Sequence, residues 1–372
     1  MRTLLHSRLA RRSAVTLAAA LLGLALAEGL ASGLRPPAHP RTVGVLLRAS
    51  QDRVLETENV PGARQEIIYR DRAGAEVRSV EHMISASGWR GPAFSQHKPP
   101  GVFRIICVGD SHTLGHGVGE DETWPRALER ALNLGQPSPR FEVLNFGVGG
   151  YGGAQKVALI ERRALASQPD VVLLQLYMND VEVGPRNLAR HTRRSPLLRL
   201  AQPNRGGWVG ALRERSGLCE LVLSSLFSRQ CLASYMGANA AGFEDSNPHW
   251  RQLQARILEC RARLEQRGVK LMVVLYPLLF EQSGQLASHG VGHAVGDFCA
   301  RESIPFVDLE PTFLGRPLTP LRIHPLDYHV TGEAHALAAR ATAEGLRSHG
   351  LLEGAAGPGH AVVLTATGSS GR

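Results

Sequence analysis

The fold is decided by the stretch Arg104-Ile105-Ile106-Cys107-Val108-Gly109-Asp110-Ser111-His112-Thr113-Leu114-Gly115. Its apolar, β-branched run predicts a buried strand that ends in Gly-Asp-Ser. A serine at the end of a strand suits nucleophilic chemistry, because the backbone fixes its Oγ and neighbouring N–H groups can face a developing oxyanion. Gly-Asp-Ser is also a common turn sequence, so the rest of the chain must decide between the two interpretations.

Strand-like and helix-like segments alternate after this stretch. Apolar runs predict strands at 141–145, 171–177, 269–276 and 305–309, and amphipathic or capped segments predict helices at 123–132, 154–167, 250–268 and 293–302. This alternation is typical of an α/β protein. We therefore expect a three-layer α/β/α sandwich around a mostly parallel, doubly wound sheet.

The composition suits one large globular domain with extensions. The chain has 372 residues, of which 43% are hydrophobic and 20% charged. The net charge of +9 could indicate a nucleic acid or a membrane surface as partner. No basic patch interleaved with aromatic residues, zinc pattern or helix-turn-helix signal is present, so we expect no nucleic-acid partner.

The N-terminal end has the pattern of an export signal. A basic segment, 1–12, precedes an apolar run at 14–27. Two interpretations remain: residues 13–34 form an uncleaved membrane anchor with its arginine-rich end in the cytoplasm, or Ala25-Leu26-Ala27 is a cleavage site and the remainder is secreted. We favour the anchor, and in both cases the rest of the chain lies outside the cytoplasm.

The chain divides into four parts. Residues 1–34 form the basic tip and the anchor, 35–100 a small irregular or β-rich extension, and 101–350 the main domain. An insertion at 181–250 contains eight arginines between Arg186 and Arg215, which favours a solvated lid over a patch for a membrane surface or an acidic polymer. The Gly-, Ala- and Ser-rich residues 351–372 are expected to be disordered.

Five cysteines in an exported chain raise the question of disulfides. Cys219 and Cys231 bracket a short loop and could pair, although the spacing alone does not show it. The odd number leaves at least one thiol free, and none of the five has metal-ligand spacing.

Three further segments carry candidate site residues. Glycines follow the strand at 141–145, where backbone can approach a ligand closely. Asn179 follows the most apolar strand, at the edge of an open α/β sheet where ligands bind. Near the C-terminus, Asp327 and His329 could both reach the serine, with the aspartate fixing the tautomer of the imidazole. Metal binding by His324, Asp327 and His329 is the rival interpretation.

In this order the four segments resemble those of the SGNH (GDSL-type) hydrolase superfamily, over about 102–349. Gly109-Asp110-Ser111 is similar to its serine block, Asn145-Phe-Gly-Val-Gly-Gly150 to its glycine block, Met178-Asn179-Asp180 to its asparagine block, and Asp327-Tyr-His329 to its C-terminal block. The anchor and Ser87-Gly-Trp-Arg-Gly91 resemble membrane-anchored bacterial members, which implies the inner membrane and a domain facing the periplasm or the cell exterior.

The sequence departs from the family pattern at three places. Tyr177 stands where many members have glycine, Ala334 stands where a glycine usually precedes the final histidine, and a single residue separates Asp327 from His329 where many members have two. The last departure makes Asp327 the weakest of the assignments that follow.

The resemblance implies an SGNH-type, flavodoxin-like fold and an esterase site without metal or cofactor. Its catalytic residues would be Ser111, His329 and Asp327, and its oxyanion hole would consist of Ser111, Gly150 and Asn179. Pocket neighbours would be Asp110, His112, Tyr177 and Asp180.

The expected function is a serine esterase outside the cytoplasm, acting on acyl or O-acetyl esters of a small molecule, a lipid or a glycan. Two alternatives remain: an O-acetyltransferase that modifies an envelope polysaccharide with the same residues, and a non-catalytic envelope-binding module. The oligomeric state does not follow from the sequence.

Overall fold

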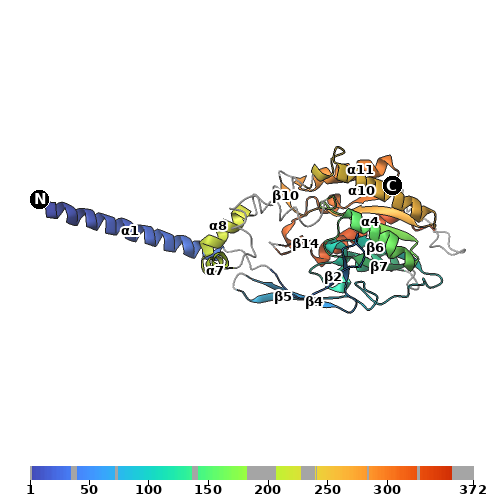
Figure 1. The fold of residues 1–372 in the computed structure, drawn as a ribbon, viewed down its shortest axis with the longest axis horizontal. Coiled ribbons are helices and arrows are strands. Elements are labelled where there is room, and N and C mark those ends of the chain that lie inside the picture. The colour runs from blue at the N-terminus through green and yellow to red at the C-terminus, as the bar shows by residue number, and fades with distance from the viewer. Residues whose placement is uncertain are drawn as a thin grey trace, which may run out of the picture.

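The structure of this protein is a computed structural model that describes residues 2–34, 40–71, 74–135, 141–181, 207–227, 239, 241–282, 285–324 and 327–353. The predicted disordered tail lies outside the described residues from 354 onwards, and so does most of the predicted arginine-rich lid. Figure 1 shows one long helix extending away from a body of strands and helices.

The body is built on a five-stranded parallel sheet with the order β12-β9-β8-β6-β7. Its strands are β6 (Phe103–Gly109), β7 (Phe141–Gly147), β8 (Val171–Leu176), β9 (Lys270–Leu275) and β12 (Phe306–Asp308). The chain moves from β6 outward to β7 and then crosses back to β8 on the other side of β6. Such a switch point opens a crevice at the carboxyl ends of the strands. The predicted doubly wound α/β fold is confirmed.

Helices cover both faces of the sheet. On one face α3 (Trp124–Asn133) packs against α13 (Gly332–Ser348), and on the other lie α4 (Gly153–Arg162), α10 (Pro248–Glu265) and α11 (His289–Arg301). Two glycines show which helix lies on which face of β12. Gly345 of α13 packs closely against the Val307 side chain, whereas Gly292 of α11 packs closely against the Asp308 side chain. Because neighbouring strand residues point to opposite faces, the two helices lie on opposite sides of β12.

One predicted helix is shorter than expected. The segment 154–167 was predicted as a single helix, but α4 ends at Arg162 and a 3₁₀ turn follows over Ala164–Ser167. Arg163, between them, has φ −133° and ψ −50°, which breaks the α-helical hydrogen-bond ladder. Neither glycine nor proline lies at the break, so composition could not reveal it.

The segment expected to be β-rich forms two small antiparallel sheets. One contains β1 (Arg41–Gly44), β4 (Arg64–Arg70) and β5 (Glu76–Met83), and the other contains β2 (Leu47–Ala49) and β3 (Thr57–Asn59). The second of these sheets is attached to the main body, since Tyr151 Oη donates to the Thr57 carbonyl at 2.5 Å and Gln155 Nε2 donates to the Leu55 carbonyl at 3.0 Å. We call residues 40–91 the N-terminal extension.

The first element of the chain is the N-terminal helix α1 (Arg2–Gly33). Among the described residues, no helix combines enough length with enough apolar character to cross a membrane, so the structure does not support the expected spanning anchor. The last turns of α1 instead contact α8 (Gly217–Phe227), beside α7 (Trp208–Arg215). There Glu28 accepts hydrogen bonds from Ser216 Oγ at 2.8 Å and from the Leu218 amide at 3.3 Å.

The remaining elements are short. They are α2 (Ser111–Leu114), β10 (Glu281–Gln282), β11 (Gln285–Leu286), α12 (Glu310–Phe313), and the hairpin of β13 (Arg322–His324) and β14 (Asp327–Val330). Cys219 is a free thiol, and its suggested partner Cys231 lies outside the described residues.

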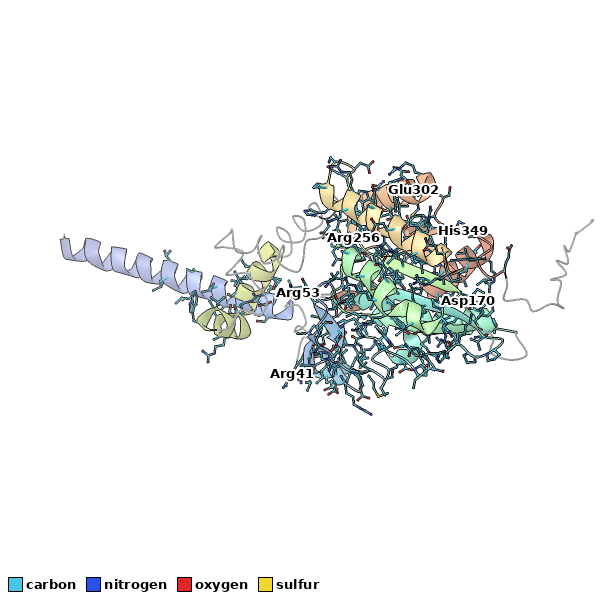
Figure 2. All side chains as sticks on the ribbon, turned by 45° about the vertical axis from the view of Figure 1, so that its right-hand side comes forward. Arg41, Arg53, Asp170, Arg256, Glu302 and His349 are labelled. Atoms are coloured by element: carbon cyan, nitrogen blue, oxygen red, sulfur yellow. The ribbon has the colours of Figure 1, made fainter. Side chains whose placement is uncertain are left out.

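The amino ends of the strands, at the opposite edge of the sheet, carry a separate cluster of charges around one buried arginine. Arg104 of β6 is fully buried and donates to Glu142 of β7 at 2.5 Å. Asp170, labelled in Figure 2, accepts from the Arg104 amide at 2.7 Å. Arg104 and Asp110 are six positions apart along the extended chain, so this cluster lies about 20 Å from the carboxyl edge.

Candidate active site

Ser111 is the first residue of α2, and only Asp110 separates it from the end of β6. The Asp110 side chain caps this helix, accepting from the His112 amide at 2.8 Å. Position 109 accepts only glycine, because a Cβ there would lie 2.0 Å from Thr113 Oγ1 and 2.3 Å from Gln175 Oε1. The Gly-Asp-Ser sequence therefore lets the strand turn sharply into a helix with the serine at its start.

The structure brings Ser111, His329 and Asp327 together, although 218 positions of sequence separate the serine from the histidine. His329 Nε2 lies 2.8 Å from Ser111 Oγ, and His329 Nδ1 lies 2.5 Å from Asp327 Oδ1. Asp327 Oδ1 also accepts from the His329 backbone amide at 3.0 Å. These contacts place one continuous chain of polar atoms between the serine hydroxyl and the carboxylate.

The charge of Asp327 sets the tautomer of His329. Burial would raise the pKa of this carboxyl, but its interactions with the imidazole rings of His116 and His329 hold that pKa well below its usual range. Asp327 is therefore an ionised acceptor, and His329 Nδ1 must donate to it. Nε2 of the neutral ring is then free to accept the proton of Ser111 Oγ.

A second histidine, not identified from the sequence, also contacts Asp327. His116 Nε2 lies 3.6 Å from Asp327 Oδ2, and the His116 ring lies 4.4 Å from the His329 ring between centroids. Burial lowers the pKa of His116. Its position five residues after Ser111 was the only signal available in the sequence.

The N-terminal extension supports the loop that carries His116. Arg90, which is buried, donates to the carbonyls of Leu114, Gly115 and Val118 at 2.7, 2.5 and 2.5 Å. His82 of β5 accepts from the Gly117 amide at 3.0 Å, and burial lowers its pKa to about 2. His82 is therefore neutral, and this part of the site depends on residues that precede the family motifs.

The glycine and asparagine segments lie in the loops after β7 and β8. Gly150 has φ +82°, a conformation that favours glycine. Among the described residues, the amides of Ser111 and Gly150 donate to no other group of the chain. Asn179 follows β8, and its Oδ1 is buried without a partner in the part of the chain that the structure describes. The structure thus leaves two backbone donors, at Ser111 and Gly150, and one side-chain acceptor, at Asn179, without a partner among the described residues.

The four predicted pocket neighbours are buried beneath this site. The His112 ring packs 4.4 Å from the Tyr177 ring and 5.2 Å from the His329 ring, between centroids. Asp110 and Asp180 are joined by Lys156 of α4, whose Nζ lies 2.7 Å from Asp110 Oδ2 and 2.8 Å from Asp180 Oδ2. Lys156 was not identified from the sequence, where it is one of several polar residues on a predicted helix.

The rival metal interpretation named His324 as a ligand, but the structure places a different histidine beside Asp327 and His329. Within the described residues, His116, Asp327 and His329 have ligand atoms within 4.8 Å of one another. His324 lies instead in β13, its ring 5.8 Å from that of Tyr69. Both ring nitrogens of His329 already contact Ser111 and Asp327, which favours proton transfer over metal ligation.

Comparison with known proteins identifies the family of the chain. The model of the GDSL-like lipase/acylhydrolase family matches residues 107–337, well over half of the chain. That range contains the serine, glycine, asparagine and Asp/His segments. The comparison with curated protein sequences found no match.

Several solved structures are similar at low identity. TesA is 14% identical, covering 66% of this chain and 98% of its own, with a TM-score of 0.40. A catalytic mutant of Axe2, an acetylxylan esterase from Geobacillus stearothermophilus, is 15% identical, covering 66% and 94%, with a TM-score of 0.41. A two-domain esterase active on acetylated mannans is 15% identical, covering 66% and 49%, with a TM-score of 0.41.

At these identities and scores, the solved structures transfer no activity to this chain. The family match rests on the sequence itself and spans every segment of the site. The chain belongs to the GDSL-like lipase/acylhydrolase family, and it is an enzyme that acts on ester bonds.

Proposed function

We propose that the protein is a serine esterase that hydrolyses acyl or O-acetyl esters outside the cytoplasm, with Ser111, His329 and Asp327 as its catalytic triad. The observation that carries this proposal is the chain of contacts from Ser111 Oγ through both ring nitrogens of His329 to Asp327. A serine hydroxyl is a weak nucleophile unless a base accepts its proton, and this chain supplies an oriented base.

The reaction follows from these contacts. Ser111 Oγ forms a bond to the ester carbonyl carbon while its proton moves to His329 Nε2, and the Asp327 carboxylate stabilises the imidazolium. The tetrahedral intermediate collapses, the bond to the alkoxy oxygen breaks, and His329 returns the proton to the leaving alcohol. A water molecule, deprotonated by His329, then attacks the acyl-serine, releases the carboxylic acid and restores Ser111.

The oxyanion would be held by the amides of Ser111 and Gly150 and by the side-chain amide of Asn179. The two backbone amides have no other acceptor among the described residues, so they are available when negative charge develops on the carbonyl oxygen. Donors that are in place before the reaction stabilise the transition state without reorganisation.

The location outside the cytoplasm is proposed from the basic segment 1–12 and the apolar run that follows. Export machinery recognises this pattern whether or not the segment is later cleaved. Fractionation of cells expressing the full chain, followed by sequencing of the mature N-terminus, tests it. Protein recovered in the cytoplasmic fraction with its N-terminus intact would remove this part of the proposal.

The activity is tested on the full chain, purified as wild type and as Ser111→Ala. Ser348→Ala, at the end of α13, is the control. Hydrolysis of short- and long-chain p-nitrophenyl esters is followed with fluorophosphonate labelling in parallel. We expect both signals in wild type and in the control, and neither in Ser111→Ala.

The other outcomes contradict this proposal in different ways. Labelling without hydrolysis, together with acyl transfer to an added polysaccharide, would identify an O-acetyltransferase. A folded wild type that neither labels nor hydrolyses any ester would identify a binding module.

A further inference from the structure

Lys156 lies between the two loops that carry the proposed nucleophile and the proposed oxyanion donor. It is in the first turns of α4, and its side chain is completely buried. Its Nζ donates to Asp110 Oδ2 at 2.7 Å and to Asp180 Oδ2 at 2.8 Å. Asp110 directly precedes Ser111, and Asp180 directly follows Asn179.

Each of these carboxylates also holds the backbone of its own loop. The second oxygen of Asp110 accepts from the His112 amide at 2.8 Å, which fixes the start of α2. Asp180 Oδ2 accepts from the Tyr177 amide at 2.7 Å, which closes the turn that contains Asn179. The Gly153 amide, at the start of α4, donates to the Asp180 carbonyl at 2.9 Å. One ammonium group thus connects the start of α2 with the turn after β8.

We propose that Lys156 is a positioning residue, which holds Ser111 and the side-chain amide of Asn179 at the separation that the transition state requires. This inference rests on the proposed esterase mechanism and adds a residue to it. Lys156 touches neither the substrate nor the reacting atoms. It acts through Asp110 and Asp180, which are adjacent in sequence to the groups it positions.

The positive charge of Lys156, in addition to its volume, is needed for this role. Asp110 and Asp180 face a common point in the interior, and two carboxylates cannot both stay ionised there without a cation between them. Burial raises the pKa of Asp180, and the Asp110 carboxylate adds to the rise. Above the pKa of Asp180, loss of Lys156 forces one carboxyl to take up a proton or the two to separate, and either change moves a loop that carries a site residue.

The decisive comparison uses Lys156→Met, which keeps the length of the side chain and removes its charge. The double variant Lys156→Met/Asp180→Asn removes the repulsion between the carboxylates as well. Arg104→Lys is the matched control, because Arg104 is an equally buried cation at the opposite edge of the same sheet. Tm, kcat and KM are measured for p-nitrophenyl acetate with the full chain.

We expect Lys156→Met to lower Tm and to lower kcat about a hundredfold with KM nearly unchanged, because small misplacements of reacting groups have effects of this size. In the double variant Tm should recover while kcat stays low. Arg104→Lys should lower Tm and leave kcat as in wild type.

Recovery of kcat together with Tm in the double variant would overturn the proposal, since Lys156 would then serve stability alone. A Lys156→Met protein with the kcat of wild type would overturn it too. If Lys156→Met does not fold, the double variant decides by itself, because a folded double variant with the kcat of wild type contradicts a positioning role. Failure of the esterase proposal is recognised separately, by a wild type that shows no Ser111-dependent hydrolysis.

Discussion

Asp327 and His329 lie two residues apart on the extended strand β14, and their side chains meet on the same side of it, with Asp327 Oδ1 2.5 Å from His329 Nδ1. Alternate residues of a strand share a face, so a single intervening residue is the natural spacing for this pair. The short spacing is therefore compatible with the geometry of a catalytic triad.

The first prediction concerns Asp327. Replacing it with asparagine keeps the shape of the side chain but removes the negative charge that keeps the proton of His329 on Nδ1. The ring can then carry its proton on Nε2, which no longer accepts from Ser111. We expect kcat to fall about 10⁴-fold, with little change in KM. Steady-state kinetics with p-nitrophenyl acetate measures it. Asp297→Asn, on the exposed side of α11, is the control, and an equal loss in both variants would argue against a specific role.

The second prediction concerns Asn179. Removal of its side chain in Asn179→Ala deletes one oxyanion donor, which typically costs about 3 kcal/mol of transition-state stabilisation. We expect kcat to fall by two to three orders of magnitude, roughly as that energy implies, while KM changes little. Equal losses of kcat and of substrate affinity, or no loss at all, would remove Asn179 from the oxyanion hole.

The third prediction concerns His116. In His116→Ala the second oxygen of Asp327 loses a polar contact of 3.6 Å. This distance is longer than that of a hydrogen bond, so we expect a loss of only about 1 kcal/mol and a fall in kcat of about fivefold. His349→Ala is the control. His349 is labelled in Figure 2 and follows the last residue of α13. If dialysis against EDTA abolishes wild-type activity and zinc restores it, His116 belongs to a metal site and this assignment is wrong.

The fourth prediction concerns Arg90. In Arg90→Met three carbonyl groups of the loop after α2 lose their donor in a buried setting, so we expect the free energy of unfolding to fall by about 3 kcal/mol. Urea denaturation measures it. Arg64→Met is the control, because Arg64 forms an exposed ion pair with Glu81 whose loss should have almost no effect. Equal stability of the two variants would show that Arg90 does not hold this loop.

The fifth prediction concerns pH. Burial raises the pKa of Asp180 from 3.8 to about 7, with the Lys156 ammonium opposing the rise and the Asp110 carboxylate adding to it. Between about pH 4 and 7 the folded protein therefore binds a proton that the unfolded chain releases, so this contribution to the free energy of unfolding is lost as pH rises through the window.

The comparison of wild type with Asp180→Asn isolates this contribution. Asp110 and Asp327 have lowered pKa values, and the stability that they contribute is lost only below about pH 4, outside the window. We expect Tm of wild type to fall relative to Asp180→Asn between pH 4 and 7. Parallel Tm curves for the two proteins over that range would contradict the raised pKa.

The sequence determined the fold class and the order of the site segments. Strands such as β6, in which every residue is buried, are recognisable because their apolar runs are local and continuous. Ser111, Gly150 and Asn179 each lie within three residues of the end of a strand, and the ends of parallel strands must meet at one edge of the sheet. The residues after these strands could therefore be predicted to lie near one another without coordinates.

Only the tertiary structure decided which other groups support that edge. Lys156 contacts residues 46 positions before it and 24 after it, and Arg90 reaches carbonyls 24 to 28 positions away. Neither periodicity nor a sequence motif predicts such contacts, because the partners of a buried charge are distant in the sequence and come together only in the folded protein. The same reason explains Glu28, an isolated acid in an apolar helix until α8 provides the amides that it accepts from.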